Sequence, residues 1–520
     1  MKITKVDYAA TGAFSQTIAD YLAQNEKLRP FYQRFPDVAA FEEQLREKSF
    51  SQEQRQLLHQ ALQEQYASVA AVHPKVQHHL DLLQQPNTYT ITTGHQLNIF
   101  TGPLYFVYKI ITAINTCKQL QAAYPDYNFV PVYWMATEDH DFAEVNHFNL
   151  FGKRYTWETE QIGAVGRFST QGLERVLEEL PEQFPVFEEA YRHSKTLADA
   201  TRAITHALFG EYGLVSVDGD HPALKQALTP VIEKELTEQL SNRLVTEANA
   251  QLEQLGYKPQ VFSREINLFY LKDNLRERIV QEGDTYKVLN TNIQFSREEA
   301  LRLAQEHPEQ FSPNVILRPL YEELILPNLA YIGGGAEVAY WFQLKKVFEA
   351  YGVPFPVLML RNSALYISKP NASRMHKLGL QPLDLFKDYQ ELKKQLSAQL
   401  HEGEIDLEAQ REALAAVFKQ VEQLAEGIDP TLVKAVAAEA QKASNSLHML
   451  EKKLSKARDS KHEQTFKQLE NLKDKLFPNG SLQERQDNLL SYKTNHPDFI
   501  PALVEAFDPF EFKFTILEEE

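Results

Sequence analysis

One stretch decides the fold of this chain: Thr92-Thr93-Gly94-His95-Gln96-Leu97-Asn98-Ile99-Phe100-Thr101-Gly102-Pro103-Leu104-Tyr105-Phe106-Val107-Tyr108-Lys109. It follows a short β-type run, residues 89–92, and leads into an apolar segment, residues 105–120, with helical character. Many α/β proteins build nucleotide or anion sites from such a strand, polar turn and helix start, because free backbone N–H groups and the positive helix end meet the ligand there. The sequence therefore predicts a ligand site in this turn.

A second buried strand is predicted at residues 129–135, where the run reads Phe-Val-Pro-Val-Tyr-Trp-Met. With a helix at 105–124 as the crossover, the two strands form one βαβ unit of a parallel sheet. Polar motifs follow the carboxyl end of each strand, and open α/β sheets bind their ligands at that edge. The expected fold class is α/β with a Rossmann-like core.

The composition is that of a soluble globular protein of two or three domains, with 520 residues, 43% hydrophobic and 24% charged. The formal net charge of −17 argues against nucleic acid or a membrane surface as a partner, although an anionic small substrate would still need a local basic pocket. The single cysteine, Cys117, excludes an intramolecular disulfide and a Cys-based zinc site, and we expect it to be a small buried hydrophobe. The amino terminus lacks a signal-peptide pattern and no apolar run is long enough to span a bilayer, so we expect a cytoplasmic protein.

Three parts are predicted along the chain. Residues 1–380 form the Rossmann-like core, with an N-terminal helical region and insertions at about 151–205 and in parts of 223–310. Residues 381–478 form a helical coiled-coil domain, and residues 479–520 return to the core. Further strands are expected at 213–218, 269–271, 315–317, 355–360 and 512–517.

The coiled-coil prediction rests on apolar residues at helical spacing. Leucines and valines recur at spacings of seven, three, four and three from Leu407 to Leu424. A break at residues 426–430 is followed by residues 431–477, which contain neither Gly nor Pro. Two long helices joined at this break predict an antiparallel hairpin with a role in packing or dimerisation, and we expect a homodimer through it.

The turn after the first strand carries more polar groups than a helix cap requires. His95 is suited to donate to a phosphate or carboxylate oxygen or to act as an acid or base, and Asn98 is suited to orient a ligand. The alternative is a plain turn whose polar groups cap the helix. His95 and Asn98 are predicted to be catalytic. The predicted binding residues of this segment are Thr93, Gly94, Gln96, Thr101, Gly102 and Lys109.

The second cluster, residues 137–147, directly follows the strand at 129–135. If it is helical, His140, Glu144 and His147 share one face at i, i+4 and i+7, a spacing that suits a metal ion. Two alternatives are a substrate pocket that grips an ammonium group and a set of acidic caps that complement the helix dipole. No metal ligand is assigned. The residues assigned in this cluster are Asp139 and His140 as catalytic and Glu138 and Asp141 as binding.

The third cluster is a glycine turn before a helix start, residues 331–343. Three consecutive glycines let the backbone approach a ligand closely, although the turn is neither a Walker A loop nor a GxGxxG motif. A further pocket edge is expected after the strand at 355–360. The predicted binding residues of these two segments and of the chain just upstream are Arg318, Gly333, Gly334, Gly335, Glu337, Tyr340, Trp341, Arg361, Asn362 and Ser363. The sequence lacks G-x-S-x-G, H-E-x-x-H and EF-hand motifs, which disfavours α/β-hydrolases, proteases and zincins.

Taken together, these motifs resemble the signature of the bacillithiol-biosynthesis cysteine-adding enzymes. The residues that carry the resemblance are Thr93-Gly94-His95-Gln96, Thr101-Gly102-Pro103-Leu104-Tyr105, Pro131-Val132-Tyr133-Trp134-Met135-Ala136-Thr137-Glu138-Asp139-His140-Asp141, Ser312-Pro313-Asn314-Val315, Arg318-Pro319, Tyr331-Ile332-Gly333-Gly334, Glu337-Val338-Ala339-Tyr340-Trp341, Arg361-Asn362-Ser363 and Leu482-Gln483-Glu484-Arg485. The likeness extends over essentially the whole chain, and the joint pattern is much more specific than any of its parts.

The resemblance implies a core related to class I aminoacyl-tRNA synthetases, with connecting-peptide insertions, and a coiled coil that supports dimerisation. It also implies a ligase that joins the carboxyl group of L-cysteine to the amino group of glucosaminyl-malate in the last step of bacillithiol biosynthesis. ATP or another nucleotide is expected to activate the carboxylate, with Mg as an accompanying ion. Gly94-His95-Gln96 is only partly similar to the H-I-G-H motif of the synthetases, and K-M-S-K-S is absent.

Charge pairing assigns roles within this hypothesis. His95 and Asn98 contact phosphate or carboxylate oxygens, while Glu138 and Asp139 bind the cysteine ammonium group. The candidates for neutralising the malate carboxylates are Lys109, Arg318 and Arg361. Two alternatives remain open: a synthetase-like nucleotidyl-transfer enzyme acting on another amino donor, and a non-catalytic scaffold that holds pathway partners with its coiled coil.

Overall fold

The computed structural model describes residues 1–400 and 405–520, apart from the side chains of residues 458, 459 and 461. Residues 401–404, which fall within the predicted coiled-coil domain, lie outside the described residues. The chain forms two compact units. One holds residues 3–365 and 481–517, and the other holds residues 1–2, 366–480 and 518–520. Among the described residues, no helix combines the length and the apolar character needed to cross a membrane.

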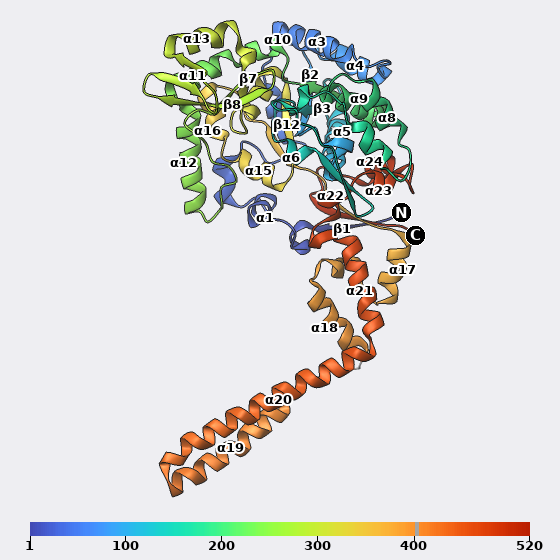
Figure 1. Ribbon diagram of the computed structural model, residues 1–520, viewed down its shortest axis with the longest axis vertical. Helices are drawn as coiled ribbons and strands as arrows, with labels where there is room; N and C mark the ends of the chain where they lie inside the picture. Colours follow the sequence, from blue (N-terminus) through green and yellow to red (C-terminus); the bar gives the residue numbers. More distant parts are fainter. Residues whose placement is uncertain (401–404) are drawn as a thin grey trace. The chain divides into compact units, whose positions relative to one another are not determined.

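The larger unit is built around a five-stranded parallel sheet with the strand order β13-β12-β2-β3-β6 (Figure 1). Its strands are β2 (Thr88–His95), β3 (Asn128–Met135), β6 (Val215–Asp218), β12 (Asn328–Gly333) and β13 (Val357–Leu360). All but the ends of these strands are buried, as expected for continuous apolar runs in a sheet covered on both faces. The predicted parallel βαβ unit is confirmed, with α5 (Tyr105–Ala123) as its crossover helix.

Helix α5 packs on the sheet through an apolar cluster that ties the strands together. Its Ala113, Cys117 and Leu120 lie against Ile91 of β2 and Phe129 of β3. Cys117 is a free, buried thiol, which confirms its predicted role as a small hydrophobe. In the register of β2 and β3, Gly94 pairs with Trp134 and His95 with Met135, so the polar turns after both strands leave the sheet at the same edge.

Helices and three further sheets complete the described fold. A five-stranded antiparallel sheet, β10-β9-β8-β7-β11, consists of β7 (Leu268–Lys272), β8 (Leu275–Glu282), β9 (Thr285–Val288), β10 (Gln294–Ser296) and β11 (Phe311–Pro313). β4 (His147–Leu150) and β5 (Lys153–Thr156) form a hairpin, while β1 (Lys2–Asp7), β15 (Lys513–Glu518) and β14 (Ala364–Ile367) form a three-stranded sheet. The remaining helices of the larger unit are α1 (Gln16–Leu22), α2 (Ala40–Glu47), α3 (Gln52–Tyr66), α4 (Pro74–Leu82), α6 (Phe142–Val145), α7 (Leu173–Glu178), α8 (Pro185–His193), α9 (Leu197–Phe209), α10 (Pro222–Lys225), α11 (Thr229–Glu238), α12 (Leu240–Gln254), α13 (Arg297–Glu306), α14 (Arg318–Ile325), α15 (Gly335–Trp341), α16 (Lys345–Tyr351), α22 (Gln483–Gln486), α23 (Leu490–Lys493) and α24 (Phe499–Ala506).

One expected strand, residues 315–317, is wrong. The side-chain Oδ1 of Asn314 accepts a hydrogen bond from the backbone N–H of Ile316 at 2.9 Å, and its carbonyl accepts from the N–H of Arg318 at 2.8 Å. These bonds turn the chain into α14. Ile316 and Leu317 are buried from a turn, whereas Val315 is exposed, and a short apolar run in the sequence cannot distinguish such a turn from a strand.

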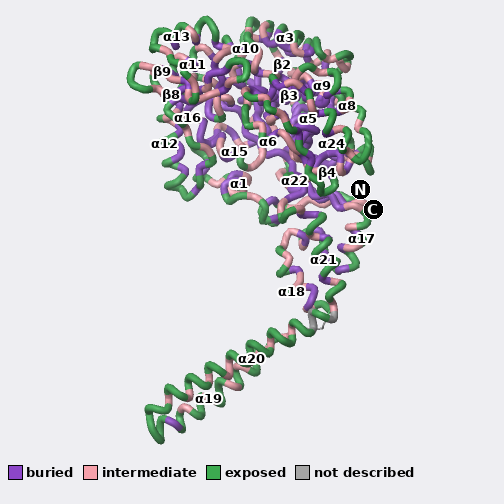
Figure 2. Tube along the Cα trace, in the orientation of Figure 1, coloured by how far each residue is buried: buried purple, intermediate pink, exposed green. Residues whose placement is uncertain are grey.

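The smaller unit is helical. Its helices are α17 (Lys369–Lys377), α18 (Tyr389–Leu400), α19 (Glu408–Ile428), α20 (Val433–Lys461) and α21 (Glu463–Leu476). Asp429 ends α19, and its carboxylate accepts from the N–H of Thr431 at 2.9 Å, so the predicted break between two long helices is confirmed. Helices α19 and α20 lie side by side and are largely exposed along their length (Figures 1 and 2).

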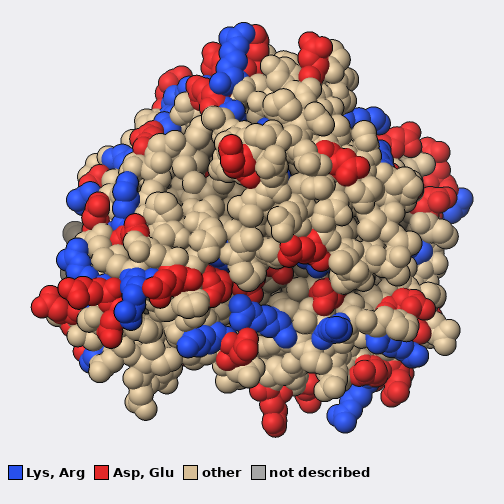
Figure 3. Space-filling model, turned by 90° about the horizontal axis from the view of Figure 1, so that it is seen from above, with Lys and Arg blue, Asp and Glu red and all other residues tan. Residues whose placement is uncertain are grey.

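Charged side chains of both signs are interspersed over the surface seen in Figure 3, with wide uncharged areas between them. That face shows no continuous basic stripe of the kind that binds a phosphate backbone.

Candidate functional site

A cavity of about 770 Å³ opens in the larger unit beside the carboxyl ends of β2 and β3. Its walls come from the turn after β2, the start of α5, the chain after β3, the helices α14 and α15, and the segment after β13. Twelve of the residues predicted from sequence line this one cavity: Gly94, His95, Gln96, Lys109, Asp139, Arg318, Gly334, Gly335, Glu337, Tyr340, Trp341 and Arg361. All three sequence clusters therefore contribute to it.

Lys109 joins the first cluster to the glycine turn. Its side chain is 1% exposed, and its ammonium group donates to the carbonyl of Gly94 and to both carboxylate oxygens of Glu337, at 2.7 and 2.8 Å. Glu337 also accepts from the backbone N–H of Gly334 at 2.6 Å. Burial lowers the pKa of Lys109 below its usual value, against the opposing charge of Glu337. This ion pair, buried on the lysine side and 29% exposed at Glu337, links the turn after β2 to the glycine turn across the cavity.

His95 presents an unsatisfied ring nitrogen. Its Nε2 is buried and has no hydrogen-bond partner among the described residues, and its ring packs against those of Tyr105 and Phe106 at 5.4 and 5.2 Å. Burial, together with the nearby charges of Lys109 and Arg361, holds the pKa of His95 well below 6.5. The imidazole is therefore neutral near pH 7 and can offer either a donor or an acceptor to a ligand.

Arg361 is held rigidly from behind. Its two Nη atoms donate to the carboxylate of Glu484 at 2.6 Å and to Oγ of Ser363 at 2.9 Å, while its Nε is buried without a partner in the described part of the chain. The residue's guanidinium lies 5.3 Å from the ring centroid of Tyr105. Ser363 and Asn362 do not line the cavity, and Asn362 instead donates to the carbonyl of Asp508 at 2.8 Å.

The second cluster is engaged in ion pairs. Asp139 accepts two hydrogen bonds from Arg318, one of them at 3.1 Å, and lies 3.8 Å from Arg276. Although burial raises it, the pKa of Asp139 is held below its usual value by these two arginines. Arg276 also donates to Nδ1 of His140 at 2.6 Å, and burial with this neighbouring charge lowers the pKa of His140. Asp139 thus orients two arginines toward the cavity.

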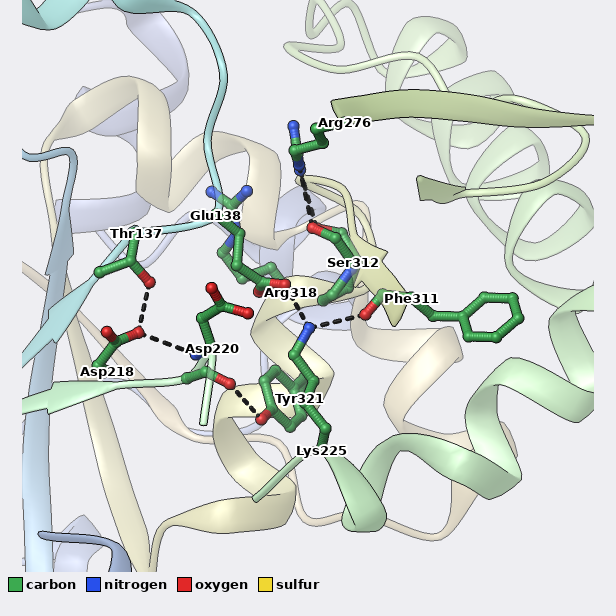
Figure 4. Close-up of polar contacts among 12 residues, drawn as sticks. Thr137, Glu138, Asp218, Asp220, Lys225, Arg276, Phe311, Ser312, Arg318 and Tyr321 are labelled. Carbon is green, nitrogen blue, oxygen red and sulfur yellow. Dashed lines mark hydrogen bonds and ion pairs between the residues drawn. The ribbon is translucent and has the colours of Figure 1, made fainter. Parts of the chain in front are cut away.

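Glu138 is not part of the cavity lining. Its buried carboxylate forms an ion pair with the buried ammonium group of Lys225, which also donates to the carbonyl of Phe311 at 2.7 Å. Figure 4 shows the same region anchored by Thr137 on Asp218 and by Tyr321 on a backbone carbonyl. The pair ties the chain after β3 to α10 and β11.

The other predicted residues support the cavity from outside its lining. Thr93 donates to the carbonyl of Ile332 at 2.8 Å and so links β2 to β12. Asn98 lines a neighbouring cavity of about 430 Å³, which shares Gln96, Tyr105, Glu144 and Arg485 with the larger one. Asn98 donates to the carbonyl of Glu144 at 3.0 Å, and its Oδ1 is buried without a described partner.

Gly102 has φ +59°, and a Cβ there would lie 2.5 Å from the Cβ of Asn98, so the turn requires glycine. Thr101 is buried beside it with its hydroxyl unpaired among the described residues. In the glycine turn, the carbonyl of Gly333 accepts a hydrogen bond from the backbone N–H of Arg361 at 2.9 Å. In the segment after β3, Asp141 is exposed just before α6. These residues shape the turns on either side of the cavity.

The predicted helical face of His140, Glu144 and His147 is wrong. Helix α6 contains a single turn, residues 142–145, so His140 precedes it and His147 opens β4. Asp141 starts this turn and Asn146 ends it, which keeps the two imidazoles off a common face. Within residues 1–400 and 405–520, no group of three or more His, Cys, Asp or Glu side chains is placed to hold a metal ion.

Several lining residues were not predicted from the sequence. They are Tyr105, Trp134, Arg276, Arg278, Glu322, Tyr331 and Arg485. A signal existed for some of them: Arg276 and Arg278 lie two residues apart on one face of β8, and Glu322 lies one helical turn after Arg318. With them the lining holds seven cationic side chains, Lys109 and six arginines, against four carboxylates.

The fold and the cavity define a Rossmann-like domain with a charged small-molecule site, joined to a coiled-coil domain. The family model for the N-terminal Rossmann-like domain of bacillithiol biosynthesis BshC matches residues 1–362, and the model for its C-terminal coiled-coil domain matches residues 364–519. The chain belongs to the bacillithiol biosynthesis BshC family.

Three relatives in this family are similar over nearly their whole length. The chain is 44% identical over 525 residues to a protein of Flavobacterium johnsoniae, covering 98% of this chain and 99% of the relative. It is 42% identical over 510 residues to a protein of Cytophaga hutchinsonii, covering 98% of each, and 43% identical over 527 residues to one of Flavobacterium psychrophilum, covering 99% of each. All three carry the name "Putative cysteine ligase BshC". The predicted family and its role in bacillithiol biosynthesis are confirmed.

Proposed function

We propose that this chain is a cysteine ligase that joins the carboxyl group of L-cysteine to the amino group of glucosaminyl-malate, the last step of bacillithiol biosynthesis. The observation that carries the proposal is the cation-rich cavity of about 770 Å³ at the carboxyl edge of the parallel sheet. It lies in a chain whose net charge is −17, so the positive lining is a local feature of the site. Both proposed substrates bring carboxylates, and malate brings two.

The lining suits anions for a geometric reason as well. Arg318 and Arg361 are each held by a carboxylate from behind, by Asp139 and by Glu484. Such pairs orient a guanidinium without requiring the ligand to order it, and arginine matches the planar shape of a carboxylate or phosphate. The buried Nε of Arg361 and the neutral Nε2 of His95 have no described partner and provide contacts that a ligand oxygen can complete.

Amide formation from a free carboxylate needs activation, and we propose that ATP or another nucleotide supplies it, accompanied by Mg. The unpaired buried nitrogens of His95 and Arg361 fit a phosphoryl or carboxylate oxygen, and the turn at Gly94 places backbone beside them. In the bond-forming step the amine nitrogen attacks the activated carbonyl carbon, the activating group leaves with its oxygen, and the amine loses a proton to a base. The chain's own residues bind and orient the two reactants and exclude water.

The same hypothesis includes finer features of the architecture. We propose a class I aminoacyl-tRNA-synthetase-like core with connecting-peptide insertions, and an antiparallel pairing of α19 and α20. Exposed apolar side chains on α19 and α20 support a homodimer through this hairpin, with Leu424 68% and Ile428 80% exposed. The substrates are small molecules, and nucleic acid and membrane are not among the proposed partners.

The test is mass spectrometry of thiols and their precursors in cells that lack this protein, complemented with wild type, His95→Ala or the exposed-histidine control His193→Ala. Glucosaminyl-malate should accumulate and bacillithiol should disappear, with rescue by wild type and His193→Ala but not by His95→Ala. Normal bacillithiol in the deleted cells would contradict the proposal. Full rescue by a folded His95→Ala variant would remove His95 from the site while leaving the reaction intact.

A further inference from the structure

Two neighbouring glutamates on α14 have opposite environments. Glu323 is buried and fully engaged, with its carboxylate 2.6 Å from the ammonium group of Lys48 and 2.5 Å from the side-chain amide of Asn328. Glu322 is equally buried, at 3% exposure, but its Oε1 has no hydrogen-bond partner among the described residues. A buried, unpaired carboxyl oxygen costs stability, so its presence requires an explanation.

Glu322 differs from every other carboxylate in the lining of the larger cavity. Asp139 is held by Arg318 and Arg276, and Glu337 is held by Lys109 and by a backbone N–H. Glu144 accepts from the side-chain amide of Gln96 at 2.6 Å. Within the described lining, Glu322 is thus the carboxylate whose buried oxygen has no donor. A ligand in the cavity can supply that donor.

We propose that Glu322 is the cavity's receptor for a protonated primary amine. This inference rests on the proposed function, in which both substrates carry such a group: the α-ammonium of L-cysteine and the 2-ammonium of the aminosugar. An ammonium group has three donors and one positive charge, which matches a carboxyl that lacks both a donor and a dedicated counter-ion. This role for Glu322 replaces the assignment of the ammonium group to Glu138 and Asp139. Glu138 is not in the lining and is already paired with Lys225, and Asp139 is already paired with two arginines.

The charge state of Glu322 in the free protein fits this role. Burial, reinforced by the charge of Glu323, raises the pKa of Glu322 well above 4.5, while Lys109 and Arg318 lower it. The charged groups that face it come from three helices: Lys109 of α5, Arg318 and Glu323 of α14 and Glu337 of α15. An arriving ammonium group favours the ionised carboxylate, so amine binding should release a proton from the protein.

The first experiment measures binding to the full-length protein by calorimetry with paired probes that differ in the amine. L-cysteine is compared with 3-mercaptopropanoic acid, and D-glucosamine with N-acetyl-D-glucosamine. Wild type should prefer the free-amine member of one pair by roughly tenfold or more, because a hydrogen bond to a charged group is lost with the amine, and tenfold corresponds to about 1.4 kcal/mol. Glu322→Gln should reduce that preference to about twofold or less, whereas the exposed control Glu298→Gln should keep it. The pair that responds identifies which substrate's amine is bound.

Proton release gives a readout that a structural role would not move. In two buffers of different ionisation enthalpy, the apparent binding enthalpy should differ for wild type and coincide for Glu322→Gln. A wild type that shows no amine preference in either pair, or a Glu322→Gln variant that retains the preference, overturns the inference. These results are independent of turnover. A protein that binds amines through Glu322 but forms no amide with any nucleotide would instead contradict the proposed function alone.

Stability supplies the second test. Because the folded-state pKa of Glu322 is raised, the folded protein holds this proton more tightly than the unfolded chain, and the carboxyl lowers stability as pH rises above 4.5. Glu322→Leu should therefore raise the melting temperature at pH 7 while abolishing amine preference, and the gain should shrink as pH falls toward 4.5. A lower melting temperature for this variant at pH 7 would assign Glu322 a structural role and overturn the inference.

Discussion

The parallel sheet and the α19–α20 hairpin use the same apolar residue types in opposite ways. In the sheet, all of β12 and nearly all of β2 are buried, so their side chains are covered by the chain itself. In the hairpin, Leu424, Ile428 and Leu450 are 68%, 80% and 50% exposed. The sheet is a completed core that can hold a site rigidly. The hairpin carries apolar surface that another surface can still cover.

The ion pairs of the two regions also differ in how deeply they are buried. Around the sheet, Lys225–Glu138 and Arg361–Glu484 are buried pairs with additional hydrogen bonds. On the hairpin, Arg411 lies 2.5 Å from Glu451, but both groups are partly exposed. Removing one member of a buried pair leaves an uncompensated charge, whereas solvent compensates an exposed one. Single substitutions should therefore have very different effects in the two regions.

The largest effect is expected from Lys225→Met. It leaves the buried carboxylate of Glu138 without its counter-ion, which typically costs about 3–5 kcal/mol. Urea denaturation should show a correspondingly lower free energy of unfolding. The double variant Glu138→Gln/Lys225→Met should recover part of the loss, because it removes the stranded charge. A Lys225→Met protein as stable as wild type would show that the pair does not carry this part of the core.

A smaller effect, on activity rather than folding, is expected from Arg361→Lys. Lysine can keep the ion pair with Glu484 but lacks the Nε that Arg361 leaves unpaired toward the cavity. Loss of one charged hydrogen bond to the substrate, about 1.5–3 kcal/mol, should lower kcat/KM roughly 10- to 100-fold. Steady-state kinetics and thermal melting of the same preparation separate the two effects. Unchanged kcat/KM would place the ligand away from Arg361.

The fold of the core was largely predictable, because its strands are long apolar runs buried on both faces. Residues 129–135 became β3 and the helix from Tyr105 became α5. The antiparallel sheet was less visible. Its strand β8 contains three consecutive charged residues, Arg276, Glu277 and Arg278, and ends in Glu282, a pattern that also suits an exposed segment. The single-turn helix α6 could not be foreseen either, since its ends are set by bonds of the folded chain rather than by a breaker residue.

The sequence predicted which turns line the site, but it did not predict which residues pair with the charged side chains there. The turn residues Gly94 and His95 line the cavity, because parallel strands end at one edge of the sheet. The fate of each charge depends on a residue far away in sequence. Glu138 is neutralised by Lys225 and Arg361 by Glu484, 87 and 123 residues distant. Charge type alone therefore suggested Glu138 for an ammonium group, and only the structure shows that this carboxylate is already paired.

A substitution at an exposed leucine of the hairpin should weaken the proposed homodimer rather than the folding of the single chain. Leu450→Ala removes apolar surface that is half exposed in the single chain, and in the proposed homodimer the loss of a partly buried leucine is worth about 1 kcal/mol. Sedimentation equilibrium should show a dimer weakened by about fivefold to tenfold, with the melting temperature little changed. The exposed neighbour Lys442, replaced by Ala, provides the control. A dimer whose dissociation constant is unchanged by Leu450→Ala would contradict a dimer contact at Leu450 and would leave the apolar positions of α19 as the candidates.

The smallest effect is expected from Arg411→Ala, and it sharpens the contrast with Lys225. Arg411 forms ion pairs with both Glu408 of its own helix and Glu451 of α20, so it has at least as many ion pairs as the buried Lys225 has with Glu138. Its side chain is nevertheless partly exposed to solvent, which screens the pairs and hydrates the glutamates when the arginine is lost. Thermal melting at low and high salt should show a shift near the error of the measurement, and none at high salt. A large destabilisation would mean that the seam between α19 and α20 excludes water at this point, and that the hairpin is packed more like the core than its exposed leucines indicate.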